Sequence, residues 1–396
     1  MQCHWKLVLT ACLIAAAGAV AEARQSRKQT PSASATAPDD KFLPVGYASP
    51  GQSTYSHEDP SCEDEPSCGA CCDPCCRAGW LGGAAIYFLR PYFQDNQAFT
   101  TSTGLTTANR SRVTTDFDWN YSTSPLFWLG YQFQNGWGVR TRFFYFDQGS
   151  NSPATSLAAA VAASSEIRPP AQLPDLDLVV PRTGLGSPGV LLGRGLGVDR
   201  LLYNSGLRIN AYDFEAIYDI RGCTYSLLFS GGVRYLYMAQ RYDQLLRNTV
   251  TVGYNTATEM SQLDFLHNFT GVGPTAALQA HRTLGATRLA LFGDVRSSLL
   301  AGTARRTLAF QQVVDDPGGI GGGSQTRSAA ATASQTRVLS VIELEVGLEY
   351  TRHIRCADLF ARGALVDQTY FGAGNASRQE GNFSLFGAQV SVGVNY

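Results

Sequence analysis

The sequence predicts an all-β protein, a transmembrane antiparallel up-and-down β-barrel of about ten strands, with twelve strands also open. Three observations predict this fold class. Apolar and polar residues alternate along most segments after residue 79, short and long connections alternate between these segments, and the last segment ends on an aromatic residue. This alternation is typical of strands that face lipid on one side and a polar interior on the other.

The last segment, 384–396, carries a period-2 apolar row that ends the chain. Such a row is typical of the strand that the barrel-assembly machinery recognises, although an edge strand of a soluble β-sandwich would also fit this stretch alone. Because a closed barrel must join its ends, we expect this strand to pair with the segment 80–93 and to face lipid. The predicted assembly signal consists of Phe386, Val390, Val392, Val394 and Tyr396.

Ten segments show the strand pattern: 80–93, 126–134, 137–147, 207–220, 223–241, 263–281, 287–300, 338–352, 356–371 and 384–396. Short turns are predicted near Asn135, Arg221, Gly285 and Ile354, with Asn135-Gly136 as a two-residue hairpin. Long polar connections are predicted over 94–124, 149–206, 242–262, 301–337 and 372–382. In a bacterial barrel, short turns are periplasmic and long loops are extracellular. Both ends of the barrel are therefore expected on the periplasmic side.

Along these strands, charged residues alternate with the apolar ones and so lie on the opposite face. A charged side chain in contact with lipid would be costly. We predict that they line the lumen. Ten strands leave a narrow passage, and paired charges filling it completely are the alternative interpretation. The predicted lumen-lining residues are Arg140, Arg142, Asp213, Glu215, Asp219, Arg234, Arg288, Asp294, Arg296, Glu343, Glu345, Glu349, Asp358 and Arg362.

The N-terminal region predicts export from the cytoplasm. Lys6 precedes an apolar run from Leu7 to Ala21, and Ala21-Glu22-Ala23 matches a cleavage site, so residues 1–23 are predicted to be a cleaved signal peptide. Residues 24–78 are rich in Ser, Pro and Ala without periodicity, which predicts a flexible periplasmic extension. The barrel is assigned to residues 79–396, and the predicted location is the outer membrane, in contact with its lipid.

The extension contains six cysteines within fifteen residues: Cys62, Cys68, Cys71, Cys72, Cys75 and Cys76. Disulfide bonds, within or between chains, are the favoured interpretation because an oxidising compartment promotes them. A thiolate zinc site is the alternative, although no metal is assigned. A disulfide-linked or cell-wall partner held through residues 62–76 is a further expectation.

The long connection 149–206 suggests a plug. Ser152 can cap a short helix that starts at Pro153, continues through Ala163 and stops before Pro169. We expect this helix either to fold into the barrel mouth or to lie on the surface.

Enzymatic and nucleic-acid functions are disfavoured. The formal net charge of −1 offers no basic face for phosphate, so no nucleic acid is expected. No cofactor motif occurs, and the glycine pattern at 184–189 lacks a strand-then-helix context. Asp264 and His267 could form half of an acid/base pair, but residues three apart on a strand point to opposite faces. No catalytic residue is assigned.

From about residue 79 to residue 396 the chain resembles the pore-forming outer-membrane proteins of the Legionella major outer membrane protein type. The resemblance rests on G-W-L-G-G-A-A-I-Y-F-L-R-P at 79–91, N-F-T-G-V-G-P at 268–274, V-G-L-E-Y at 346–350 and the closing F-S-L-F-G-A-Q-V-S-V-G-V-N-Y. It implies a β-barrel pore that can be disulfide-linked. The cysteine-rich extension and the connection 149–206 do not map onto this pattern.

The predicted function is a narrow pore for passive passage of ions or small solutes. A plugged structural or surface-interaction barrel is the alternative, and a barrel hydrolase is a distant third.

Overall fold

The structure is a computed structural model that describes residues 78–94, 96–103, 111–150, 166–168, 198–222, 224–252, 255–285, 287–316, 323–354, 357–375 and 381–395. The predicted signal peptide, the cysteine cluster and the predicted helix after Ser152 lie outside these residues. No helix in the described part is long and apolar enough to cross a membrane.

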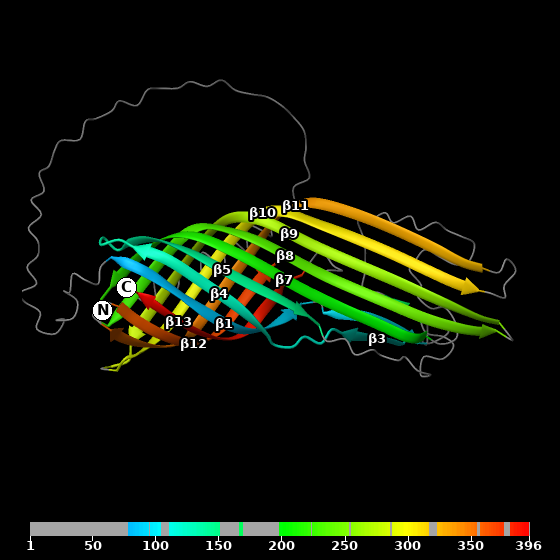
Figure 1. Cartoon of the computed structure of the whole chain (residues 1–396), viewed down its shortest axis with the longest axis horizontal. Coiled ribbons are helices and arrows are strands. Elements are labelled where there is room, and N and C mark those ends of the chain that lie inside the picture. The colour runs from blue at the N-terminus through cyan, green and yellow to red at the C-terminus, as the bar shows by residue number, and fades with distance from the viewer. Residues whose placement is uncertain are drawn as a thin grey trace, which may run out of the picture. The chain divides into compact units, whose positions relative to one another are not determined.

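Ten strands close into one antiparallel barrel, which confirms the predicted fold class (Figure 1). A separate small sheet contains β2 (Gln97–Thr103), β3 (Ser111–Asp116) and β6 (Glu166–Arg168) in the order β3-β2-β6. The barrel strands are β1 (Gly79–Phe93), β4 (Ser122–Gln132), β5 (Trp137–Gly149), β7 (Val198–Arg221), β8 (Tyr225–Val252), β9 (Asn255–Thr283), β10 (Leu289–Asp316), β11 (Gly323–Ile354), β12 (Ala357–Phe371) and β13 (Phe383–Asn395).

Tight turns join the strands at one end of the barrel, called here the short-turn end. The Asn135-Gly136 hairpin is confirmed, with Gly136 at a φ of 82°, a conformation that glycine adopts without steric cost. Gly285 has a φ of 62° in the predicted turn between β9 and β10. The opposite end, toward which the long hairpins β8–β9 and β10–β11 project, is called the long-hairpin end.

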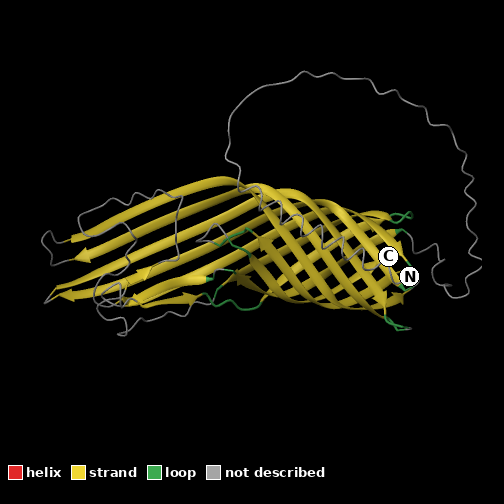
Figure 2. Ribbon diagram, turned by 180° about the vertical axis from the view of Figure 1, so that it is seen from behind, coloured by secondary structure: helices red, strands yellow, loops and turns green. Residues whose placement is uncertain are grey.

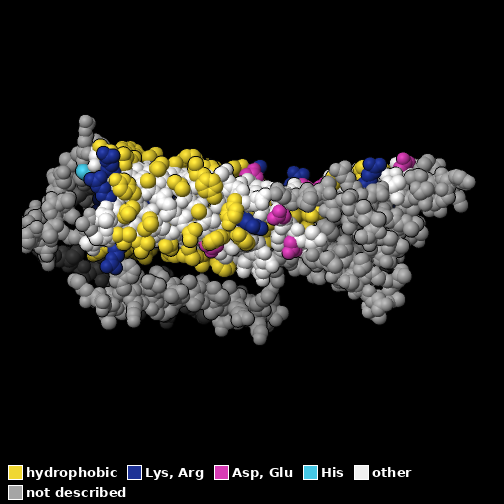
Figure 3. Space-filling view, turned by 90° about the horizontal axis from the view of Figure 1, so that it is seen from below, with side chains coloured by type: hydrophobic (Ala, Val, Ile, Leu, Met, Phe, Trp, Pro, Cys, Tyr) yellow, Lys and Arg dark blue, Asp and Glu magenta, His cyan; other side chains and the backbone are white. Residues whose placement is uncertain are grey.

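An outward row of large apolar side chains surrounds the barrel and forms what we call the apolar band (Figure 3). Successive strand residues point to opposite faces, so one row of every strand contributes to this band. On the outer face, charged residues such as Asp147, Arg208, Arg241 and Asp264 occur beyond it, toward the long-hairpin end. The band includes Ile86, Phe88, Phe127, Leu129, Phe214, Val233, Val272, Leu291, Leu299, Val338, Val346, Leu348, Leu365, Val390 and Val392.

Two of the predicted long loops are wrong, and a third, 149–206, is wrong at its end, where β7 already starts at Val198. Residues 242–262 and 301–337 mostly continue the ladders of β8 with β9 and β10 with β11, up to Val252 opposite Asn255 and Asp316 opposite Gly323. These strands project beyond the rest of the barrel (Figure 2). Outside a membrane a strand needs no lipid-facing apolar row, so polar residues such as Ser, Thr and Gln hid the continuation. The connection predicted at 94–124 likewise contains β2 and β3.

The closing seam lies between β1 and β13, as predicted. Leu81 pairs with Asn395, and the register continues without a shift to Phe93 opposite Phe383. Phe386, Val390 and Val392 are exposed on the outer face, as expected for this strand, and Tyr396 lies outside the described residues. At Gly387 the two backbones approach closely, because a Cβ there would lie 1.8 Å from the carbonyl oxygen of Phe88.

Gly387→Ala is expected to weaken the seam, because the added methyl group collides with backbone that cannot move without breaking the ladder. Overpacking of this kind costs about 1–3 kcal/mol. The loss is measured as a lower urea midpoint for the folded barrel in lipid vesicles. Gly363→Ala is the matched control, since a Cβ there meets nothing within 4 Å. Equal midpoints for the two variants would contradict the close approach.

Candidate functional site in the barrel interior

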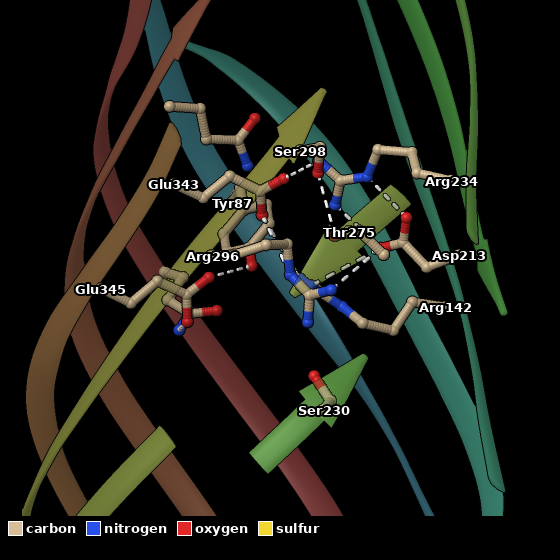
Figure 4. Close-up of polar contacts among 12 residues, drawn as sticks. Tyr87, Arg142, Asp213, Ser230, Arg234, Thr275, Arg296, Ser298, Glu343 and Glu345 are labelled. Carbon is tan, nitrogen blue, oxygen red and sulfur yellow. Dashed lines mark hydrogen bonds and ion pairs between the residues drawn. The ribbon is translucent and has the colours of Figure 1, made fainter. Parts of the chain in front are cut away.

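A layer of buried charged side chains crosses the barrel interior within the apolar band (Figure 4). Alternation along five strands, β5, β7, β8, β10 and β11, turns these side chains inward. We call them the ion-pair layer. It comprises four arginines and four carboxylates: Arg140, Arg142, Arg234, Arg296, Asp213, Glu215, Glu343 and Glu345.

Arg234 and Asp213 form a two-pronged pair on neighbouring strands. The Nε atom of Arg234 donates to Oδ1 of Asp213 at 2.5 Å, and its Nη2 atom donates to Oδ2 at 2.8 Å. Arg234 also pairs with Glu343 on β11. Since β8 and β11 are not neighbours in the sheet, this contact bridges the interior.

Glu215 is fully buried and lies between two arginines. Nη2 of Arg140 is 2.8 Å from its Oε2 atom, and Arg296 contacts Oε1. Arg296 is 1% exposed and also lies 3.6 Å from Asp213. Arg142 is within 3.7 Å of Asp213 and 3.8 Å of Glu343. Asp213, Glu215 and Glu343 therefore each have more than one arginine within 4 Å.

Glu345 has neutral partners. The Tyr87 hydroxyl donates to Oε1 at 2.6 Å, and Nε2 of Gln389 donates to Oε2 at 2.7 Å. Tyr87 comes from β1 and Gln389 from β13, so this carboxylate is linked to the closing seam.

A cavity of about 380 Å³ extends from the ion-pair layer to the short-turn end. We call it the vestibule. Its walls carry Asp294, and Arg362 contacts Glu349 and lies over the Phe360 ring at 4.2 Å. His281 Nδ1 lies 3.5 Å from the same Glu349 carboxylate. The vestibule is lined by charges of both signs.

The remaining predicted lumen residues lie at the mouth of the vestibule. Asp219 pairs with Arg221 at 2.6 Å, and Asp358 pairs with His353 at 2.8 Å. Arg288 is exposed in the turn before β10, outside the strands, and borders the mouth. The structure thus brings the predicted charges together in two places, the ion-pair layer and the vestibule, and leaves Arg288 at the rim.

The other half of the interior is apolar, which sequence reasoning missed. Above the ion-pair layer, toward the long-hairpin end, large side chains pack together in the barrel. The sequence does contain a sign of it: apolar residues also occupy the inward-facing positions of some strands, such as Leu207 and Ile209 or Leu236 and Met238. This apolar half includes Leu89, Phe146, Leu207, Ile209, Leu236, Met238, Tyr242, Phe265, Phe269, Leu300, Val341, Val366, Tyr370, Phe383 and Leu385.

Part of the connection between β1 and β4 inserts into this apolar half. We call residues 96–98 and 117–119 the inserted segment. Phe117 packs against Tyr203 and Tyr242, with ring centroids 5.9 and 5.7 Å apart, and Trp119 packs against Phe93 at 5.3 Å. Phe117 and Trp119 are both buried.

Asn96 fixes the inserted segment. Its Nδ2 atom donates to the Phe117 carbonyl at 2.6 Å, and its Oδ1 atom accepts from Nε1 of Trp119 at 2.9 Å. The Tyr242 hydroxyl donates to the Ala98 carbonyl at 3.0 Å. A second connection, after β12, contributes buried Ala373 and Gly374, whose carbonyl accepts from Gln240 at 3.1 Å.

Asp264 and His267 point to opposite faces of β9, as expected. Asp264 lies on the outer face opposite Asp243, above the apolar band; partial burial and the neighbouring Asp243 carboxyl raise its pKa. His267 is buried inside the barrel. The two residues therefore do not form an acid/base pair. Among the described residues, no group of three His, Cys, Asp or Glu side chains is arranged to hold a metal.

A closed antiparallel barrel with an apolar band and buried interior charges defines an outer-membrane β-barrel protein. The family model described as "Legionella pneumophila major outer membrane protein precursor" matches residues 72–395. The chain belongs to this family, which confirms the resemblance predicted from the sequence. No curated protein sequence matches the chain.

The comparison with solved structures gives matches of low identity and low TM-score. The outer membrane protease OmpT from Escherichia coli is 9% identical over 80% of this chain and 96% of its own, with a TM-score of 0.33. A TodX mutant, a monoaromatic hydrocarbon channel, is 8% identical over 80% and 91%, with a TM-score of 0.26. The Ralstonia pickettii toluene transporter TbuX is 10% identical over 81% and 89%, with a TM-score of 0.23.

Arg296→Met is expected to lower the free energy of unfolding by about 3–5 kcal/mol, because it leaves buried carboxylates without one of their cations. Urea unfolding in lipid vesicles measures the loss. The double variant Arg296→Met with Glu215→Gln should recover part of it. Arg208→Met, in the exposed pair with Asp147, is the control and should cost about 0–1 kcal/mol. Equal losses for the two single variants would contradict the buried layer.

Asp264→Asn is expected to stabilise the β8–β9 hairpin at pH 7. A raised folded pKa means that ionisation costs stability above the unfolded pKa of about 3.9. Asparagine removes this cost, so the gain should disappear near pH 3, where the aspartate is protonated. Hydrogen exchange of the hairpin amides at both pH values measures the effect. A gain of the same size at pH 3 would contradict this explanation.

Proposed function

We propose that the protein forms a narrow pore for ions or small solutes in the outer membrane, and that this structure is its closed state. The observation that carries the proposal is the ion-pair layer at the end of an open vestibule. Burying charges is expensive, and well-packed apolar residues of similar volume often give equal or greater stability. The apolar half of the same barrel uses that solution. A charged layer that adjoins a vestibule therefore suits a route for hydrated solutes better than a structural core.

Opening of the proposed pore requires two changes. Exchange of partners within the ion-pair layer makes a gap there, because Asp213, Glu215 and Glu343 each already lie near more than one arginine. Displacement of the inserted segment then removes Phe117 and Trp119 from the apolar half. Among the described hydrogen bonds, those of Asn96 join the two parts of the inserted segment, and that of Tyr242 joins the segment to β8.

A plugged structural or surface-interaction barrel is the second candidate. The tightly packed apolar half favours it, since the interior is closed there by side chains from many strands. The proposal includes no catalytic step, so a barrel hydrolase is not carried further.

The remaining assignments are part of the same proposal. The short-turn end faces the periplasm and the long hairpins face outward, as is usual for bacterial barrels. Residues 1–23 act as a signal peptide, and the extension through residue 78 remains periplasmic. Its cysteines form disulfide bonds, within the chain or to a partner; unchanged migration without reductant together with stoichiometric zinc would overturn this assignment. The terminal strand engages the barrel-assembly machinery.

Phe117→Ala is expected to increase the open time of the pore in planar bilayers, because it removes the aromatic contacts that hold the inserted segment. Asn96→Ala should act in the same direction by releasing Phe117 and Trp119. Single-channel recording provides the measurement.

Phe127→Ala is the control, since Phe127 lies on the outer face and should leave conductance unchanged. Refolded protein that never conducts, in the wild type and in both interior variants, would reject the pore and favour the plugged barrel.

A further inference from the structure

The projecting part of β11 has a free backbone edge. β10 pairs with β11 from Tyr350 up to Gly323, whereas β12 pairs only from Ile354 to Ser340. Residues 323–339 therefore have a ladder partner on one side only among the described strands. From Gly323 to Thr336, every side chain is exposed or half-buried, on both faces of the strand. Figure 2 shows these strands projecting past the closed part of the barrel.

This edge has little of the usual protection against pairing, since Arg327 is the one charged side chain between Thr326 and Thr336. Proteins block exposed edges with proline, bulges, inward charges or very short strands. Residues 323–339 contain no proline, and the ladder with β10 continues without a register shift. Most side chains are Ser, Ala, Thr or Gln, and the charged ones are Arg327 and Arg337. The edge is long, regular and formed by small side chains, so a second strand can approach it closely.

The sequence of the edge is complementary to itself in the antiparallel direction. When a second copy pairs antiparallel with Ala331 opposite its own Ala331, no like charges face each other. When Thr332 lies opposite Thr332 instead, Arg327 faces Arg337. Directly opposed like charges destabilise a sheet, and Thr–Thr and Ser–Thr pairs stabilise it. The pairs centred on Ala331 are Thr326 with Thr336, Arg327 with Gln335, Ser328 with Ser334, and Ala329 with Ala333.

Symmetry decides where the second copy lies. Antiparallel neighbours in a sheet are related by a two-fold axis perpendicular to the sheet. Because the wall of a barrel stands across the membrane, such an axis lies in the membrane plane and turns the second barrel upside down. A copy in the same membrane therefore cannot form this pairing.

We propose that residues 326–336 bind the same edge of a second copy of this chain held in a facing membrane. The interface is isologous, with each edge contributing the same residues. The inference relies on the proposed outward orientation of the long hairpins, and it is independent of whether the barrel conducts.

Tethering of vesicles tests this pairing. The full chain is reconstituted into two populations of phosphatidylcholine/phosphatidylglycerol vesicles with donor and acceptor dyes, and tethering is measured by energy transfer between vesicles. Wild-type vesicles should tether. Ala331→Arg in both populations places two arginines opposite each other, as Ala331→Glu places two glutamates, and each should weaken tethering by about fivefold. Mixing Ala331→Arg vesicles with Ala331→Glu vesicles should restore it.

Gln311→Arg and Gln311→Glu are the matched controls, because Gln311 is an exposed residue of β10 opposite Ser328, in the same projecting hairpin but one strand away from the edge. They should tether as the wild type does in every combination. Absence of tethering by the wild type would overturn the proposal, as would unchanged tethering by the Ala331 variants or a mixed pair no better than the like-charged pairs. Restoration in the mixed pair shows that both variants fold, and conductance of the same preparations reports on the pore separately.

Discussion

Closure of the hydrogen-bonded sheet is the constraint on which the rest of this structure depends. In lipid every backbone polar group has to be bonded within the protein, so a sheet that crosses a membrane can have no open edge there. The β1–β13 seam meets this requirement. Once the sheet is closed, alternation along each strand sends one row of side chains to lipid and the other to the interior. Within the membrane, the outward row has to be apolar, so the interior side chains are the ones that the sequence can vary.

The interior uses two different solutions. Near the short-turn end, charges of both signs line the vestibule and meet in the ion-pair layer. Toward the long-hairpin end, apolar side chains and the inserted segment fill the barrel. Burying charged groups in a barrel costs desolvation free energy even when they are paired, whereas packing apolar side chains there carries no such cost. The protein retains the costly solution beside the vestibule, at the place where the proposed pore would open.

The barrel was predictable because membrane crossing imposes a strict period of two. The strand with Arg140 and Arg142 and the terminal strand with Val390 and Val392 both carry this period, and the side-chain directions they predict are those of the structure. The extended hairpins were missed because residues such as Ser328 and Ala330 face water on both sides, which removes the pattern. The inserted segment was missed for another reason. Phe117 is buried against Tyr203 and Trp119 against Phe93, and both partners belong to other strands of the barrel. No local pattern encodes such contacts.

The most direct test of the two-part interior compares two tryptophans that both point inward. Trp128 borders the vestibule, whereas Trp119 lies 2% exposed in the apolar half. Hydroxyl-radical footprinting of the folded protein in vesicles, read out by mass spectrometry of each peptide, measures contact of each ring with water. We expect rapid oxidation of Trp128 and protection of Trp119. Oxidation of Trp119 as fast as that of Trp128 would contradict a closed, dry half above the ion-pair layer.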